Sequence, residues 1–126
     1  MRKGTTIVAL VALLVAIFAT AAYAATIYCD GGGCFGTSDP DTLWEDNADN
    51  VNDQMYGYGG EDELYAYQYE NDVDKLYGGR GNDLVVTLDG DTDDVANGGR
   101  GRHDRCFVDP GDEVHACDGN VFHEAA

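Results

Sequence analysis

From residue 25 onward, apolar residues recur in short pulses that follow an acidic residue, and no stretch shows the 3.6-residue period of a helix. The pulse Asp83-Leu84-Val85-Val86 has the length of a short strand in which only alternate positions can face inward. Many pulses are separated by glycines, and the 17 glycines of the chain would weaken any helix. The pattern predicts one all-β domain of very short strands and turns, from about Ile27 to Phe122.

The pulses fit a nine-residue unit, of which GGRGNDLVV (78–86) is the clearest copy. GYGGEDELY (57–65) matches it more loosely, and ADNVNDQMY (48–56) lacks the glycines. The copy between them and residue 78 is either 66–74, with Asn71 and Val73, or 69–77, with Asp74 and Leu76. We prefer the second register, because it keeps the Asp and abuts the best unit. A nine-residue unit is half a coil of a parallel β-roll, so units 18 residues apart should stack.

Each pulse offers one residue to the interior, and the resulting core is thin. The core candidates are Leu43, Val51, Met55, Leu64, Leu76, Val85, Val95, Cys106 and Val114, with Val73 if the other register holds. Ten side chains at ~1.5–3 kcal/mol each do not offset the entropy of ordering the chain. A further stabilising element is therefore expected.

Acidic residues at the ends of the glycine turns point to a bound cation. Ca²⁺ accepts 6–8 oxygen ligands from carboxylates and backbone carbonyls in flexible geometry, whereas Mg²⁺ requires a near-octahedral site and retains its waters. In stacking order Asp62 and Asp83 belong to one side of the roll, and Asp53 and Asp74 belong to the other. Each pair of turns could hold one ion. Asp93 and Asp104 are further candidate ligands outside this block.

Three segments, GYGGEDELY, DKLYGGRGNDLVV and GGRGRHD, resemble the haemolysin-type, or RTX, calcium-binding repeat. The outer segments IYCDGGGCFGTSDPDTL and DRCFVDPGDEVHACDGN are similar to capped secreted RTX-like proteins of actinobacteria. The resemblance implies a right-handed parallel β-roll with Ca²⁺ between its turns. It assigns Gly79, Gly81 and Asp83 to the best site, with Gly59 and Asp62 as a looser match. Tyr69, Asn71 and Asp49 stand where the motif has glycine, so those turns should bind weakly or not at all.

The first 24 residues have the pattern of a secretory signal peptide. A basic start, Met1-Arg2-Lys3, is followed by an apolar run over 7–19 and by the small-x-small sequence Ala22-Tyr23-Ala24. The apolar run is shorter than the ~20 residues that a membrane-spanning helix needs. We expect cleavage after Ala24, a secreted protein of residues 25–126, and no stable membrane insertion after cleavage.

Charge and cysteine content agree with an exported binding protein. Without residues 1–24, the chain has 24 acidic and five basic residues, a balance that disfavours binding to nucleic acid or anionic membranes. The only basic cluster, Arg100, Arg102 and Arg105, should pair locally with Asp104 or Asp109. An even number of cysteines predicts two disulfides, for which three connectivities are possible. The neighbours at each end, Cys29–Cys34 and Cys106–Cys117, make the simplest pairing.

Catalytic chemistry has little support in this sequence. Ser38 is the only serine, and His103, His115 and His123 lack the spacing of a zinc site. We therefore expect no enzyme, but a secreted Ca²⁺-binding repeat protein whose folding is coupled to the ion. The alternative is a disulfide-capped structural or adhesion solenoid. In that case its exposed Tyr face, with Tyr56 and Tyr77, would bind a cell-surface partner or carbohydrate, although cross-strand ring pairing explains the same residues.

Overall fold

The computed structural model describes residues 23–46, 51–66, 71–118 and 121–123. They form strands and turns, with no helix among them. The strands are β1 (Ala25–Cys29), β2 (Gly32–Phe35), β3 (Asp41–Glu45), β4 (Asp53–Gly59), β5 (Glu63–Tyr65), β6 (Lys75–Arg80), β7 (Leu84–Thr87), β8 (Val95–Arg100), β9 (Arg105–Val108), β10 (Glu113–His115) and β11 (Val121–His123). The prediction of an all-β domain of short strands is confirmed.

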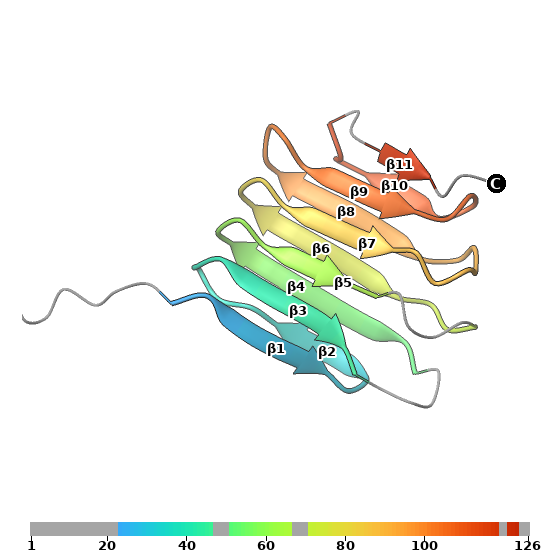
Figure 1. Ribbon diagram of the computed structural model, residues 1–126, viewed down its shortest axis with the longest axis horizontal. Helices are drawn as coiled ribbons and strands as arrows, with labels where there is room; N and C mark the ends of the chain where they lie inside the picture. Colours follow the sequence, from blue (N-terminus) through green and yellow to red (C-terminus); the bar gives the residue numbers. More distant parts are fainter. Residues whose placement is uncertain (1–22, 47–50, 67–70, 119–120, 124–126) are drawn as a thin grey trace, which may run out of the picture.

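The strands alternate between two parallel sheets, so that successive coils stack into a solenoid (Figure 1). Sheet A has the order β1-β3-β5-β7-β9-β11, and sheet B has the order β10-β8-β6-β4-β2. Every strand pair between neighbouring coils is parallel, as in the pair β5 and β7. Each odd-numbered strand therefore lies beside the strand two further along the chain. This topology confirms the predicted parallel β-solenoid.

The coils repeat every 20 or 21 residues through the middle of the chain, and the expected 18-residue repeat is wrong. Leu43 pairs with Leu64, Leu64 with Val85, and Val85 with Cys106, in steps of 21 residues. In sheet B, Met55 pairs with Leu76, which confirms the preferred register of the 69–77 unit. The difference arises because the turns from sheet A to sheet B are longer than a nine-residue unit allows.

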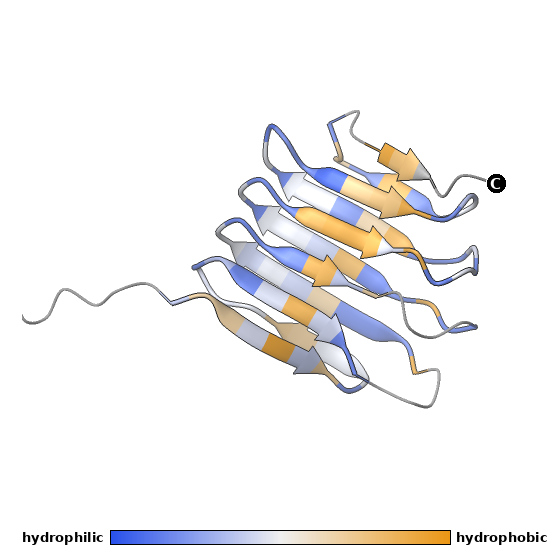
Figure 2. Ribbon diagram, viewed as in Figure 1, coloured by the Kyte–Doolittle hydropathy of each residue, from blue (hydrophilic) through white to orange (hydrophobic). Residues whose placement is uncertain are grey.

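The core is a narrow double row of inward side chains between the two sheets, while the polar positions gather in the turns (Figure 2). Leu43, Met55, Leu64, Leu76, Val85 and Cys106 are fully buried, as predicted. Val51 is exposed, and in β8 the inward position belongs to Ala96 rather than Val95, so these two core predictions are wrong. The correction in β8 also means that Asp94, not Asp93, precedes the strand at an inward position.

A disulfide closes each end of the stack. Cys29 is bonded to Cys34 and Cys106 to Cys117, so the simplest of the three connectivities is the one present. The first links β1 to β2, and the second links β9 to the segment that follows β10. Within the described ranges there is no helix that is long and apolar enough to cross a membrane. The predicted signal peptide lies almost wholly outside the described residues.

Candidate metal centre

The turns of the solenoid form two edges of different chemistry. The glycine-turn edge consists of the turns from sheet B to sheet A, at 36–40, 60–62, 81–83 and 101–104, and lies at the left of Figure 1. The acidic-turn edge consists of the turns from sheet A to sheet B, which follow β3, β5, β7 and β9 and lie at the right. Four arginines, Arg80, Arg100, Arg102 and Arg105, lie at the glycine-turn edge. The described part of the acidic-turn edge has one basic residue nearby, Lys75.

A column of aspartates, here called the first Asp ladder, follows the glycine-turn edge. Its members are Asp41, Asp62, Asp83 and Asp104, spaced 21 residues apart and all buried. The main-chain N–H of Asp41 donates to Oδ1 of Asp62 at 2.8 Å, and that of Asp62 donates to Oδ1 of Asp83 at 2.9 Å. The N–H of Asp83 donates in the same way to Oδ1 of Asp104 at 2.8 Å. Each carboxylate thus fixes the register between two coils.

Glycines make room for these carboxylates. A Cβ on Gly78 would lie 2.4 Å from Oδ2 of Asp83, and one on Gly57 would lie 2.4 Å from Oδ2 of Asp62. The carboxylate therefore occupies the inward space that a side chain would need. Gly79 and Gly81 have φ values of 106° and 130°, which L-residues with side chains rarely adopt. This explains why glycines precede the Asp in the best unit.

A second Asp ladder follows the acidic-turn edge, with Asp53, Asp74, Asp94 and Asp112 immediately before or at the start of the sheet B strands. The N–H of Asp53 donates to Oδ1 of Asp74 at 2.7 Å, and that of Asp74 donates to Oδ1 of Asp94 at 2.8 Å. A longer bond of 3.3 Å joins the N–H of Asp94 to Oδ1 of Asp112. The two edges thus use the same coil-to-coil hydrogen bond.

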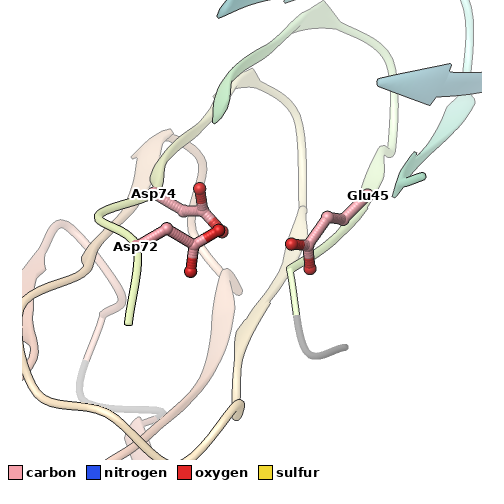
Figure 3. Close-up of side chains that lie close together, drawn as sticks. All are labelled: Glu45, Asp72 and Asp74. Atoms are coloured by element: carbon pink, nitrogen blue, oxygen red, sulfur yellow. The ribbon is translucent and has the colours of Figure 1, made fainter. Parts of the chain in front are cut away.

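Additional acids turn the second ladder into a chain of carboxylate groups. In each group the candidate ligand atoms lie within 4.8 Å of one another. The groups are Glu45, Asp72 and Asp74; Asp72, Asp89 and Asp91; Asp74, Asp89 and Asp94; and Asp91, Asp94 and Asp112. Figure 3 shows the carboxylates of the first group turned toward one another. Within the described residues, no such group contains a member of the first ladder.

Several of these carboxylates have a buried oxygen that no hydrogen-bond donor of the described chain reaches. Asp74 and Asp94 are fully buried, and Oδ2 of each lacks a donor. Both oxygens of Asp72 and Oδ2 of Asp89 are in the same condition, as is Oδ2 of Asp62, Asp83 and Asp104 in the first ladder. A buried acceptor without a partner costs about 1–3 kcal/mol, and more when it is charged. The arrangement is therefore unfavourable without a further ligand.

At one end of each ladder, by contrast, protein donors satisfy the second oxygen. Oδ2 of Asp41 accepts hydrogen bonds from the N–H and the hydroxyl of Thr37, at 2.5 and 2.9 Å. Oδ2 of Asp112 accepts from the Thr87 hydroxyl at 2.8 Å and from the N–H of Asp109 at 2.9 Å. Among the described ladder residues, the oxygens without a donor thus belong to coils that have a neighbouring acidic turn on both sides. A cation between turns would satisfy those oxygens.

Burial and mutual repulsion raise the pKa values of these acids. Burial, followed by the negative charges of Asp72 and Glu45, raises the pKa of Asp74 from 3.8 to about 8. Burial also raises the pKa of Asp94, and the charge of Asp89 adds to the effect. In the first ladder, burial raises the pKa of Asp62 to about 7 and that of Asp83 to about 6. A cation would reverse this trend, because it stabilises the ionised carboxylates.

The structure separates the predicted site residues into two sets. Asp62, Asp83 and Asp104 belong to the first ladder, and Asp53 and Asp74 belong to the second. Gly79 and Gly81 lie in the glycine turn before Asp83, while Gly59 pairs in register with Arg80 rather than with a glycine. Asp93 is exposed beside the buried Asp94. Of the predicted ligands, only Asp74 belongs to one of the close carboxylate groups.

The remaining members of those groups were missed from the sequence. They are Glu45, Asp72, Asp89, Asp91, Asp94 and Asp112. A usable signal was the 21-residue spacing of Asp41, Asp62, Asp83 and Asp104, which gives the length of a coil directly. With that length, Asp53, Asp74 and Asp94 align on the opposite edge, and the acids around them fall into neighbouring turns.

The donor set fits a hard cation. All the candidate ligands are carboxylate oxygens, which suit Ca²⁺, Mg²⁺ or Mn²⁺, and no histidine or cysteine belongs to a group in the described residues. The described cysteines are held in disulfides. Chemically the edge can bind and be cross-linked by multivalent cations.

Comparisons with protein-family models, with curated proteins and with solved structures found no match. The class of the protein therefore follows from its own fold and site. It is an all-β parallel solenoid of about four turns, with disulfides near both ends and many buried aspartates, consistent with a β-roll. Its acidic groups could hold a metal ion.

Proposed function

We propose that this protein is an exported calcium-binding solenoid, with a binding rather than a catalytic role, in which Ca²⁺ ions between successive turns complete the fold. The observation that carries the proposal is the set of buried Oδ2 atoms without donors, chiefly those of Asp74 and Asp94, within a chain of carboxylates. Export is supported by the two disulfides, which persist in oxidising compartments. The signal-peptide pattern of residues 1–24 supports it as well.

Calcium fits this edge better than the other hard cations. The four carboxylate groups share members and extend over successive turns, so the edge offers many oxygens in an irregular arrangement. Ca²⁺ accepts 6–8 such ligands with flexible geometry, whereas Mg²⁺ demands an octahedron and gives up its waters reluctantly. The RTX-like unit at 78–86 adds a candidate site on the glycine-turn edge, next to Asp62 and Asp83. We expect ions on both edges, with the tighter binding at the acidic-turn edge.

Binding and folding are coupled in this proposal. The chain has 24 acidic residues, and its ladders place carboxylates of successive coils beside one another. Without cations these groups repel or must take up protons, and both effects oppose the compact state at neutral pH. A ligand that binds only the folded chain stabilises it in proportion to the logarithm of its concentration. Calcium should therefore shift the folding equilibrium.

Circular dichroism and thermal unfolding of the disulfide-bonded protein test the proposal. We expect a higher melting temperature in 1 mM Ca²⁺ than in excess EDTA, with a smaller effect of Mg²⁺ at equal concentration. Equal spectra and equal melting temperatures in Ca²⁺ and EDTA would reject calcium as the folding ligand. The protein would then be a disulfide-capped structural solenoid, the second candidate function. That candidate is favoured by the stacked rings on the outer faces, such as Trp44 and Tyr65 at 4.3 Å.

A further inference from the structure

The outer face of sheet B has a hollow whose floor is main chain. In the pair of β6 and β8, Gly79 lies beside Gly99, and Tyr77 lies beside Asn97. The hollow has a volume of about 470 Å³ and is lined by Tyr77, Gly79, Arg80, Asn97, Gly99 and Arg100. A Cβ on Gly99 would lie 2.3 Å from the carbonyl oxygen of Gly79, so no side chain fits on this floor. The hollow is therefore a consequence of how the coils stack.

One wall of the hollow has two guanidinium groups side by side. Arg80 and Arg100 end β6 and β8, pair in register and are both exposed. Neighbouring strands lie only ~4.8 Å apart, so the two positive charges repel each other. Among the described residues the one ion pair is that of His115 with Glu113, and no hydrogen bond involves either guanidinium. The local pairing expected for Arg100, Arg102 and Arg105 is thus not found there.

The opposite wall is aromatic and continues beyond the hollow. The ring of Tyr77 stacks on that of Tyr56, with centroids 5.0 Å apart, and Tyr56 stacks on Phe35 at 5.5 Å. This confirms that Tyr56 and Tyr77 share an outer face. A second hollow of about 360 Å³, lined by Thr37, Ser38, Tyr58, Gly59 and Arg80, continues the groove across the preceding coils. Arg80 lines both hollows.

We propose that this groove binds an acidic saccharide through a uronate residue. The planar guanidinium of Arg binds a carboxylate with two parallel hydrogen bonds, and two adjacent Arg side chains concentrate that preference at one point. The Tyr77 ring offers a flat apolar surface for a pyranose ring, and the Asn97 amide can donate to and accept from sugar hydroxyls. The site lies on the outer face of sheet B and is distinct from the carboxylate groups of the acidic-turn edge.

Charge favours such a ligand over a nucleic acid. The chain has a net charge of −17, which repels a dense polyanion over its length. Interactions of exposed charges fade beyond about 8 Å at physiological ionic strength, so a single carboxylate beside Arg80 and Arg100 senses mainly these two residues. The four arginines of the glycine-turn edge make it the locally positive part of the described chain.

Nuclear magnetic resonance titration with trigalacturonic acid tests the proposal in the disulfide-bonded protein with saturating Ca²⁺. We expect saturable shifts of the Gly79, Asn97 and Gly99 amides. The variant R80Q/R100Q should weaken binding at least about tenfold, as for the loss of a charged hydrogen bond. The control variant R102Q removes the same charge outside the hollow and should leave the affinity within about twofold.

Other outcomes would overturn the proposal. Equal binding of the trisaccharide with its carboxylates reduced to alcohols would show that the Arg pair is not used. Shifts confined to the acidic-turn edge, unchanged in R80Q/R100Q, would show that Ca²⁺ bridges the ligand. If acetate at the same carboxylate concentration shifts Gly79 and Gly99 equally, the groove binds simple anions and is not a saccharide site.

Discussion

The main-chain N–H of Asp62 donates a 2.9 Å hydrogen bond to Oδ1 of Asp83, the residue 21 positions later and one coil further along the solenoid. The second oxygen of Asp83 is buried and has no donor among the described residues. The same residue type thus fixes the register between coils with one oxygen and leaves the other for a cation. Because both ladders repeat this arrangement, coil stacking and metal binding depend on the same carboxylates.

The stability of the metal-free protein should fall as the pH rises. Burial raises the pKa of Asp62 from 3.8 to about 7, and it raises the pKa of Asp74 to about 8. Between pH ~4 and ~8 the unfolded chain has released these protons while the folded chain still holds them. The free energy of unfolding therefore decreases with pH in this range.

Thermal unfolding in EDTA at pH 5, 6, 7 and 8 checks this prediction. The melting temperature should decline steadily, and saturating Ca²⁺ should flatten or reverse the trend because it stabilises the ionised form. A melting temperature in EDTA that rises from pH 5 to pH 8 would contradict the prediction.

Adding a methyl group at Gly78 should disturb the first Asp ladder. In Gly78→Ala the new Cβ would lie 2.4 Å from Oδ2 and 2.6 Å from Cβ of Asp83, so the carboxylate must move. Overpacking of this kind costs ~1–3 kcal/mol. In the control Gly59→Ala the nearest atoms are those of Ser38 at 3.7 Å, an ordinary contact, so a change within ~0.5 kcal/mol is expected. Urea unfolding in Ca²⁺ compares the two variants, and equal stabilities would refute the ladder's steric role.

The neighbours Asp93 and Asp94 offer a matched test of the acidic-turn edge. Asp94→Asn keeps Oδ1 as an acceptor for the N–H of Asp74 and removes a buried charge from two carboxylate groups. The Ca²⁺ affinity should fall by at least about tenfold, since even indirect contacts to a metal are worth 10–100-fold. In EDTA at pH 8 the variant should be as stable as the natural chain or more stable, because it no longer buries a charge.

Asp93 is exposed, so Asp93→Asn should change the Ca²⁺ affinity by less than about threefold. The Ca²⁺ concentration at the midpoint of the melting-temperature increase reports the affinity of both variants. If Asp93→Asn weakens binding and Asp94→Asn does not, the ion lies outside the buried groups.

The two disulfides should stabilise the ends of the stack to similar degrees. The Cys106–Cys117 bond joins residues 11 positions apart, and Cys29–Cys34 joins residues five positions apart. Loop closure predicts losses of ~2–3 kcal/mol when either pair is replaced by serine, slightly more for the longer loop. Guanidinium unfolding in Ca²⁺ measures both variants. Unchanged stability of both would show that the ends are held by packing alone.

Much of this fold could be predicted because the strand pulses are local. A short pulse such as Asp83-Leu84-Val85 specifies its own strand, inward residue and preceding carboxylate, and the structure agrees. The length of a coil is set by the turns between sheets, which the nine-residue unit does not determine. Adjacent acids also made the inward position ambiguous at Asp93 and Asp94.

The close carboxylate groups could not be predicted in the same way. They form where turns of unequal length are stacked, as when Asp89, after β7, meets Asp74, before β6. Residues so far apart in sequence become neighbours only through the 20- and 21-residue registers of the two sheets. The groups thus depend on coil length, the quantity that the local pattern left open.

Isothermal titration calorimetry of the metal-stripped, disulfide-bonded protein with Ca²⁺ at pH 7.5 is the most direct test of whether the buried carboxylates bind the ion. We predict saturable binding of more than one Ca²⁺, release of protons detectable as a buffer-dependent heat, and weaker binding of Mg²⁺. Absence of saturable heat at millimolar Ca²⁺, in two buffers of different ionisation enthalpy, would contradict the proposed calcium function.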